Sequence, residues 1–221
     1  MRVLRAVARY YGLTFQMTRQ EFIRRDCDVF VEYMSRLDFG KLPECVGSHM
    51  IRDPRDIIIS GYFYHLWTKE EWALVPRSEL GNISYQQYLN GMNKEEGLLA
   101  EMEGTSHEVL TEMAKWDYGN SQIYEIKYEE MILDEEKVFR EMFKHYGFHE
   151  DAVNIAVGIA DKFSFKNKSK RKFKLSKGKS HLRSGRAKQW ESIFEDVHKQ
   201  RFKELYGDLL IKLGYEENND W

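Results

Sequence analysis

The sequence predicts an α/β fold in which helices connect the strands of a parallel sheet. Two short, largely apolar runs, at residues 45–51 and 122–128, are typical of strands. Three helical segments lie between them and another helix follows, which is the order expected of parallel strands with helical crossovers. The chain has 221 residues, 42% of them hydrophobic and 32% charged, which is ordinary for a globular protein. We therefore expect a single domain over residues 1–221.

Start and stop signals place the helices along the chain. Asp53 followed by Pro54 favours a helix start, because Asp can accept hydrogen bonds from free backbone N–H groups and Pro fits the first turn. Ser84 offers a similar cap, and Gly12 and Gly147 follow helical patterns as helix ends. In chain order we expect helix 3–11, strand 29–31, strand 45–51, helices 55–72, 84–99 and 105–116, strand 122–128, helices 134–146 and 150–159, a basic loop over 162–188, and helix 189–213.

Composition and charge limit the classes of function. The formal net charge is −2, so no global field attracts nucleic acid or membrane. No apolar run approaches the ~20 residues that span a bilayer. Cys27 and Cys45 are too few for a disulfide framework and indicate reduced thiols in a cytoplasmic protein, although one disulfide between them stays open. No His, Cys or Asp cluster has the spacing of a metal site, so we expect no metal.

The most informative segment is HMIRDPRDIIISGYFYH, residues 49–65. Arg52 follows a strand, and ligands of α/β folds bind at the carboxyl ends of strands. The helix that begins at Pro54 presents free backbone N–H groups and the positive end of its dipole. Together with Ser60, these groups predict a phosphate-binding pocket. The alternative from the residues alone is a helix cap with surface ion pairs among Asp53, Arg55 and Asp56.

A family resemblance favours the phosphate pocket. Arg-Asp-Pro-Arg-Asp, three apolar residues and then Ser closely resemble the 3′-phosphate motif of the PAPS-dependent sulfotransferases, Arg-x-Pro-Arg/Lys-Asp-x-x-x-Ser. In that family the Arg and the Ser bind the 3′-phosphate of PAPS, the sulfuryl donor. The resemblance implies that Arg52 and Ser60 bind this cofactor, whose product is PAP. It also implies a P-loop NTPase-like, three-layer α/β fold with a parallel sheet.

A second segment, residues 123–148, resembles the family's strand followed by Tyr-Glu-Asp-Leu and a helix. It runs IYEIKYEEMILDEEKVFREMFKHYGF. The resemblance implies that Tyr128 packs near the adenine, whereas the residues alone indicate an ordinary aromatic side chain at the end of a strand. Trp67 is expected as a further neighbour of the base.

A third segment, HLRSGRAKQW at residues 181–190, resembles the family's late Arg-Lys-Gly-x-x-Gly-Asp-Trp loop. The resemblance implies that Arg183, Ser184 and Gly185 contact the 3′-phosphate. The segment departs from the pattern, since Ser184 replaces Lys, Lys188 replaces the second Gly and Gln189 replaces Asp. The alternative from the residues alone is a solvated basic loop.

The family's 5′-phosphosulfate loop, which resembles Pro-Lys-x-Gly-Thr-Thr-Trp, does not occur in this sequence. In the family, the helix after that loop resembles the opening segment MRVLRAVARYYG. The resemblance therefore predicts that the first strand and its loop are missing and would precede Met1. Either residues upstream complete the donor site, or the chain is a relict that no longer transfers sulfate.

The general base is not identified by the motifs. Many cytosolic members of the family use a His about twenty residues before the 3′-phosphate Arg, and no His occupies that stretch here. Glu32 and His65 are the remaining candidates for the catalytic base, and either could instead be structural. The aromatic segment around Tyr62, Tyr64 and Trp67 is expected to contribute to an acceptor pocket.

These observations predict an enzyme that transfers a sulfuryl group from PAPS to a hydroxyl or amine of a small-molecule or glycan acceptor. The first alternative is a non-catalytic relict that binds PAP or PAPS. The second is nucleic-acid binding through residues 162–188, where Phe side chains interleave with Lys and Arg. The net charge argues against nucleic acid as a partner. The sequence gives neither the acceptor nor the oligomeric state.

Overall fold

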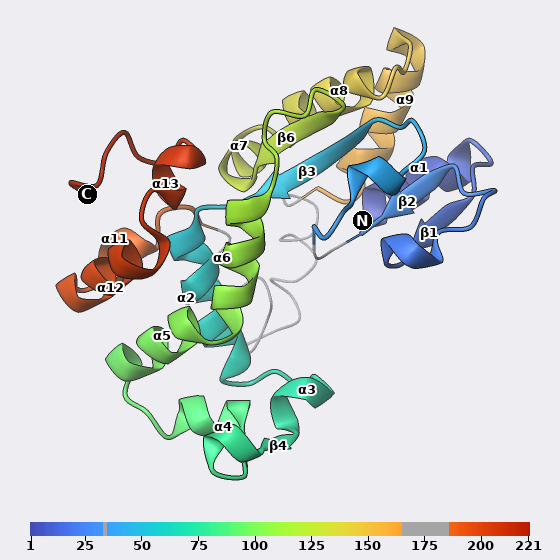
Figure 1. The fold of residues 1–221 in the computed structure, drawn as a ribbon. Helices are drawn as coiled ribbons and strands as arrows, with labels where there is room; N and C mark the ends of the chain where they lie inside the picture. Colours follow the sequence, from blue (N-terminus) through green and yellow to red (C-terminus); the bar gives the residue numbers. More distant parts are fainter. Residues whose placement is uncertain (33–34, 165–185) are drawn as a thin grey trace. The chain divides into compact units, whose positions relative to one another are not determined.

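The structure is a computed structural model that describes residues 1–32, 35–164 and 186–221 (Figure 1). Within these residues the chain divides into two units, which are treated separately below. The first unit contains residues 1–51 and 116–164, and the second contains residues 52–115 and 186–221. The expectation of a single domain stays a prediction, which a single cooperative unfolding transition would support.

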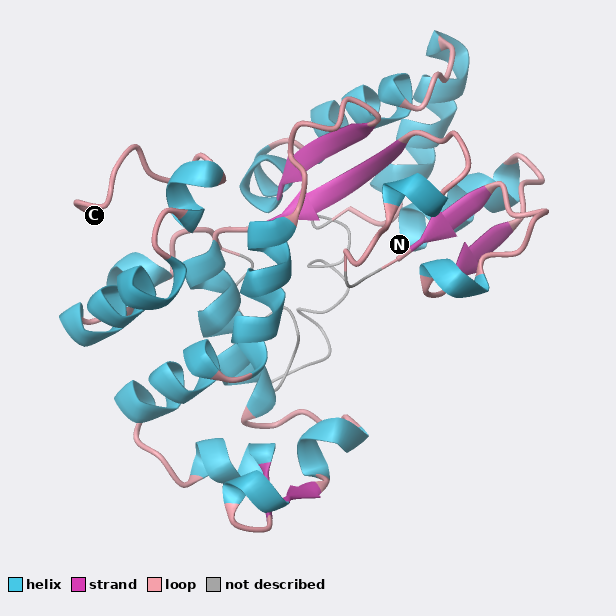
Figure 2. Cartoon of the chain, viewed as in Figure 1, coloured by secondary structure: helices cyan, strands magenta, loops and turns pink. Residues whose placement is uncertain are grey.

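The first unit is organised by two pairs of parallel strands (Figure 2). β1 (Phe15–Met17) pairs with β2 (Val29–Val31), and β3 (Gly47–Ile51) pairs with β6 (Ile123–Lys127). β3 and β6 are far apart in sequence and run in the same direction, which requires a crossover connection such as helices supply. The expected α/β class is therefore confirmed, and β1 is a strand that the sequence did not predict.

Helices of the first unit bury the apolar positions of their 3.6-residue period. α8 (Glu135–His145) packs on α9 (Glu150–Asp161), and α1 (Arg2–Tyr10) packs on α9. The core formed by these helices, β6 and the short α7 (Tyr128–Leu133) includes Val3, Val7, Ile126, Met131, Val138, Met142, Phe143, Val153, Ala156, Val157 and Ala160. Spacings of three and four residues within each helix place these side chains on one face.

Glycine ends two helices of the first unit as predicted. Gly12 and Gly147 have φ values of 69° and 81°, a left-handed conformation that favours glycine. A 3₁₀ turn, η1, occupies Gln20–Phe22, and another, η2, occupies Phe39–Lys41.

The second unit is helical and centres on α2 (Pro54–His65). α2 packs on α4 (Tyr85–Asn90), α5 (Lys94–Glu103), α6 (Thr105–Lys115) and α11 (Trp190–Ile193). Its apolar residues Ile58, Ile59 and Tyr62 are buried. The remaining elements are α3 (Glu71–Leu74), α12 (Asp196–Tyr206), α13 (Leu209–Lys212), η3 (Ser78–Leu80) and the antiparallel strands β4 (Pro76–Arg77) and β5 (Ile83–Ser84).

The predicted helix over residues 55–72 is too long, because α2 ends at His65. The hydroxyl of Tyr64 and the indole N–H of Trp72 both donate to Glu70, over 2.7 and 2.6 Å. These contacts fix a turn after α2, so that Trp72 lies in α3. The spacing of the aromatic residues is typical of a helix, but the side chains of Tyr64 and Trp72 close a turn instead.

Two other predicted helices are divided by local capping signals. The helix expected over 84–99 stops at Gly91, and Asn93 then caps α5 in a capping box with Glu96. The helix expected over 189–213 becomes α11, α12 and α13, with a break at Gly207, whose φ is 47°. The predicted caps at Asp53 and Ser84 are confirmed, since their side chains accept from the N–H groups of Arg55 and Gln87.

Candidate functional site

The candidate phosphate site lies in the second unit, at the start of α2. Arg52 follows the last residue of β3 in the chain and precedes Asp53, the N-cap of α2. Pro54 occupies the first helical position, where its missing N–H costs no hydrogen bond. Free backbone N–H groups and the positive end of the helix dipole therefore lie close in sequence to Arg52, a combination that favours anions.

The structure brings Arg52 and Ser60 together. Nη1 of Arg52 donates to Oγ of Ser60 over 2.8 Å, and Nη2 donates to Oδ2 of Asp56 over 3.2 Å. Asp56 and Ser60 are four residues apart on α2 and so share one helix face. Nη2 also donates to the backbone carbonyl of Arg186, over 3.2 Å. The guanidinium is thus held by the helix and by the segment that leads to α11.

Asp56 is a site residue that the sequence did not identify. Its side chain is fully buried, and its Oδ1 accepts the backbone N–H of Trp190 over 3.1 Å. Burial raises the pKa of Asp56, while the charge of Arg52 and the N–H of Trp190 oppose that rise. The alternative of surface ion pairs among Asp53, Arg55 and Asp56 is wrong about the surface, because all three residues are buried, although Asp53 and Arg55 do form an ion pair. The signal that could have found Asp56 is its spacing, four residues after Arg52 and four before Ser60.

The guanidinium of Arg55 forms ion pairs within the protein, so we do not assign it to anion binding. Only 2% of its side chain is exposed. Nε and Nη2 donate to the two oxygens of Asp53 over 3.0 and 2.8 Å, and Nη1 donates to Glu216 over 2.6 Å. Its guanidinium carbon also lies 3.7 Å from the ring centroid of Trp190. Two carboxylates balance its charge, so Arg52 is the arginine of this segment with donors suited to a phosphate.

The late basic segment is described only from Arg186 onward. Arg183, Ser184 and Gly185, which were predicted to bind the cofactor, lie outside the described residues. Trp190 is the first residue of α11, and its N–H is the group that bonds to Asp56.

His65 is oriented by a buried carboxylate. It lies in the last turn of α2, and its Nδ1 is 2.8 Å from Oε2 of Glu101 on α5. Glu101 is fully buried and also accepts from the hydroxyls of Tyr85, over 2.9 Å, and Ser106, over 2.6 Å. These three hydrogen-bond donors offset the free-energy cost of burying the carboxylate of Glu101. Burial also raises the pKa of Tyr85.

The network around Glu101 needs a glycine on α2. A Cβ on Gly61 would lie 2.6 Å from Oε1 of Glu101 and 3.1 Å from Oγ of Ser106. Glycine at position 61 therefore lets α5 and α6 bring these groups close to α2 and His65.

The aromatic residues near His65 take different roles. Tyr62 is 5% exposed and packs on α5, where a Cβ on Gly97 would lie 2.5 Å from its ring. Tyr64 donates to Glu70 and contacts the ring of Trp67 edge to face, with 5.3 Å between centroids. The placement of Trp67 beside the adenine stays a prediction.

Glu32 and Tyr128 belong to the first unit, whereas Arg52, Ser60 and His65 belong to the second. Glu32 follows β2, and its Oε2 accepts the backbone N–H of Arg36 over 3.2 Å. Tyr128 follows β6 as predicted and is the first residue of α7.

Other features of the described residues do not add to this site. They contain no group of three or more His, Cys, Asp and Glu side chains placed to hold a metal ion. A search of the same residues found no helix long and apolar enough to cross a membrane. A cavity of about 300 Å³ in the first unit is lined by residues of α8 and α9 and by Ser164, none of which was predicted to be functional.

Comparison with known proteins supports the interpretation of these motifs. Residues 48–214 match the family described as "Sulfotransferase domain". No curated protein sequence matches the chain. The crystal structure of retinol dehydratase in complex with androsterone and the inactive cofactor PAP is similar, with a TM-score of 0.54 and 16% identity over 86% of this chain. The crystal structure of mouse sulfotransferase SULT7A1 complexed with PAP has a TM-score of 0.51 and 15% identity over 94% of this chain.

The extent of these matches decides what they show. This chain covers 55% of the retinol dehydratase chain and 78% of the mouse sulfotransferase chain. At such low identity the two structures show the fold alone, which agrees with the predicted P-loop-like α/β class. The family match covers most of the chain and includes Arg52, Ser60 and Trp190. The chain therefore belongs to the sulfotransferase domain family.

Proposed function

We propose that this protein binds the 3′-phosphate of PAPS through Arg52 and Ser60 and transfers the sulfuryl group to a hydroxyl or amine acceptor. The observation that carries the proposal is the Arg52–Ser60 hydrogen bond of 2.8 Å at the start of α2, in a chain of the sulfotransferase domain family. The two similar structures contain PAP, which is the product left when PAPS has donated its sulfuryl group.

The residues at the start of α2 fit a phosphate. A guanidinium is a fork of N–H donors that matches phosphate oxygens, and a serine hydroxyl adds a further donor. Arg52 is 19% exposed, so its charge is partly desolvated and acts more strongly than a fully hydrated one. The buried carboxylate of Asp56 orients Arg52 through Nη2, while Nη1 is directed to Ser60.

His65 is the better candidate for the general base. PAPS, when bound, supplies the sulfuryl group and the phosphate that leaves as part of PAP. Glu101 holds Nδ1 of His65, which leaves Nε2 as the ring nitrogen that would take the proton from an acceptor hydroxyl as it attacks sulfur. Oε2 of Glu32 accepts the backbone N–H of Arg36 over 3.2 Å, which ties this carboxylate to its own loop. Tyr128 is proposed to contact the adenine, on the family resemblance alone.

The second candidate function is binding of PAP or PAPS without transfer. Residues 1–221 contain no segment resembling the 5′-phosphosulfate loop, so binding and transfer need separate measurements. Backbone N–H groups of such a loop would cradle the phosphosulfate and stabilise its developing charge. For the transferase, we propose a small-molecule or glycan acceptor and a cytoplasmic location, which agrees with the free thiols of Cys27 and Cys45.

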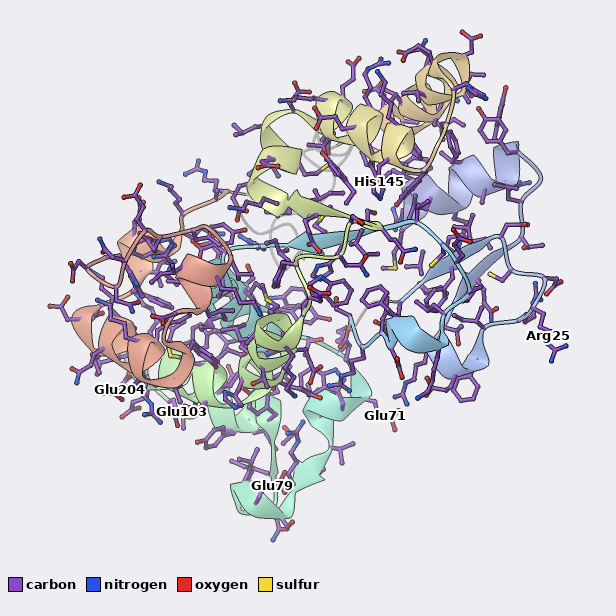
Figure 3. The ribbon with its side chains drawn as sticks, turned by 45° about the horizontal axis from the view of Figure 1, so that its top comes forward. Arg25, Glu71, Glu79, Glu103, His145 and Glu204 are labelled. Carbon is purple, nitrogen blue, oxygen red and sulfur yellow. The ribbon has the colours of Figure 1, made fainter. Side chains whose placement is uncertain are left out.

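Calorimetric titration with PAP tests the cofactor site. We expect the parent chain to bind and Arg52→Ala to weaken binding by about 10-fold or more, because it removes charge-assisted hydrogen bonds. Arg201→Ala is the matched control, since it removes one positive charge from the same unit. Arg201 lies on α12 and donates to Glu103 over 2.6 Å and to Glu204 over 3.0 Å, two residues labelled in Figure 3. A folded parent that does not bind PAP would contradict the proposal.

Turnover separates the two candidate functions. The parent is incubated with PAPS and a panel of phenols, amines and sugars, and both PAP release and acceptor sulfation are measured. Sulfation that is lost in Arg52→Ala supports the enzyme. PAP binding without sulfation of any acceptor supports the non-catalytic alternative.

A further inference from the structure

Trp221 lies against the arginine that organises the start of α2. The ring centroid of Trp221 is 4.6 Å from the guanidinium carbon of Arg55, and that of Trp190 is 3.7 Å from the same atom. The two indole rings meet edge to face, with 5.5 Å between centroids and 83° between planes. Arg55 therefore makes cation–π contacts with two tryptophans whose positions in the sequence are 31 residues apart.

Further contacts fix the segment over residues 216–221 on the second unit. Glu216 accepts from Nη1 of Arg55 over 2.6 Å. Nζ of Lys203 donates to the backbone oxygen of Trp221 over 3.0 Å and lies 4.8 Å from its ring centroid. The ring of Phe202 meets that of Trp221 edge to face at 5.6 Å. The segment is thus held at both ends, by α2 through Glu216 and by α12 through Trp221.

Face contacts, and not indole hydrogen bonds, hold the two rings. Nε1 of Trp190 and Nε1 of Trp221 are buried and have no hydrogen-bond partner within the described residues. The position of Trp190 therefore depends on packing against Arg55 and Trp221. A phenyl ring at position 221 would retain part of this packing, because Phe also forms cation–π contacts, though weaker ones than Trp.

The position of Trp190 matters to the phosphate site through one carboxylate. The N–H of Trp190 donates to Oδ1 of Asp56, and Oδ2 of Asp56 accepts from Arg52. Asp56 is fully buried, so a lost partner is not replaced cheaply by water. A continuous set of contacts therefore runs from Trp221 through Arg55 and Trp190 to Asp56, and from there to Arg52.

We propose that Trp221 is a positioning residue for the 3′-phosphate site, which its ring orders by holding Arg55 and Trp190 so that Asp56 can fix Arg52. This inference rests on the proposed function only in taking the phosphate bound by Arg52 to be the 3′-phosphate of PAPS. Glu216 supports the same arrangement from the other end of the segment. Neither residue lies in the motifs that identified the family.

The first test is calorimetric titration of PAP against Trp221→Ala and Trp221→Phe. We expect Trp221→Ala to weaken PAP binding by about 5- to 30-fold and Trp221→Phe to recover most of that loss, as the strength of a desolvated cation–π contact implies. Arg201→Ala serves again as control and is expected to bind like the parent. A folded Trp221→Ala chain with the affinity of the parent overturns the proposal.

The second test needs no ligand. Amide hydrogen exchange of the peptide that contains Trp190 is compared between the parent and the two variants, with a peptide from α6 as internal reference. We expect faster exchange at Trp190 in Trp221→Ala, because its N–H no longer keeps its bond to Asp56, and recovery in Trp221→Phe. Unchanged exchange at Trp190 overturns the proposal even if PAP binding weakens. If Trp221→Ala does not fold, Trp221→Leu and Glu216→Gln replace it, and unchanged exchange at Trp190 in both overturns the proposal.

The two tests separate this inference from the proposed function. A parent chain that does not bind PAP refutes the proposed function, and exchange at Trp190 then decides the inference alone. If PAP does bind, Arg52→Ala and Trp221→Ala are combined in a double-mutant cycle. Losses that are less than additive support action of Trp221 through Arg52, and strictly additive losses contradict it.

Discussion

Nη1 of Arg52 donates to Oγ of Ser60 over 2.8 Å, although Ser60 lies eight positions after Arg52 in the sequence. Arg52 precedes α2, and Asp56 and Ser60 occupy successive turns on one face of that helix. The guanidinium therefore spans two turns and contacts both. This arrangement gives Arg52 and Ser60 unequal roles, because the guanidinium carries the charge and the hydroxyl adds a neutral donor.

We expect Ser60→Ala to weaken PAP binding less than Arg52→Ala does. Ser60 supplies one hydrogen bond to a charged phosphate, which contributes about 1.5 kcal/mol, so the loss for Ser60→Ala should be about 10-fold. Arg52→Lys should fall between these variants, since it keeps the charge and loses the fork of donors. Calorimetric titrations of the three variants at one salt concentration give this ranking, and a Ser60→Ala loss equal to that of Arg52→Ala would contradict it.

Asp56 is expected to make stability depend on pH. Burial raises its pKa above the ordinary value of 3.8, so the folded chain holds this proton more tightly than the unfolded chain. The stabilisation from the bound proton is complete below pH 3.8 and is lost as pH rises through the raised pKa. Relative to Asp56→Asn, the free energy of unfolding of the parent should therefore fall as pH rises across that window.

Urea unfolding of both proteins over a pH series measures this difference. All groups other than residue 56 titrate in both proteins, so the difference isolates Asp56 as far as its neighbours are unchanged. A difference that stays constant with pH, or grows in favour of the parent as pH rises, would show that Arg52 and the N–H of Trp190 outweigh burial.

Gly61→Ala should destabilise the protein although alanine is the better helix former. The new Cβ would lie 2.6 Å from Oε1 of Glu101, whose carboxylate is fixed by His65, Tyr85 and Ser106. Overpacking of this kind costs about 1–3 kcal/mol, which exceeds the gain of about 1 kcal/mol in helix propensity. We expect a lower Tm in thermal unfolding followed by circular dichroism.

Gly158→Ala is the matched control for this prediction. Gly158 lies inside α9, and a Cβ there would meet nothing within 4 Å. Only the propensity gain of about 1 kcal/mol remains, so Tm should rise by about 2–4 °C. Similar Tm shifts for both variants would show that the hydrogen bonds of Glu101 rearrange at little cost to accommodate a methyl group at position 61.

His65→Gln is expected to reduce turnover and spare PAP binding. A general base contributes about 10²- to 10⁴-fold to the rate, and Gln can still donate to Glu101 without accepting a proton. The measurement is kcat with PAPS at saturating acceptor, together with the Kd for PAP. Glu32→Gln is the comparison, and retained turnover in His65→Gln with loss in Glu32→Gln would reassign the base.

Helix boundaries and motifs of this protein could be predicted from short stretches of its sequence. Asp53 and Pro54 start α2, and Ser84, Gly12 and Gly147 mark helix boundaries, because caps and left-handed glycines depend on groups within a few residues. The α/β order and the sulfotransferase motif were also readable, since both lie in local patterns along the chain. The end of α2 at His65 could not be predicted in the same way. It depends on Glu70, whose carboxylate accepts the hydrogen bonds that close the following turn.

Which charged groups are buried, and which partners they have, depends on tertiary packing and could not be predicted from the sequence. Asp56 and Arg55 look like surface residues of a helix start, yet they are buried beneath contacts with Trp190 and Glu216, more than 100 residues away. His65 likewise gains Glu101 from another helix. Burial and long-range pairing depend on which helix faces meet, and that is set by the packing of the whole unit and not by any single segment.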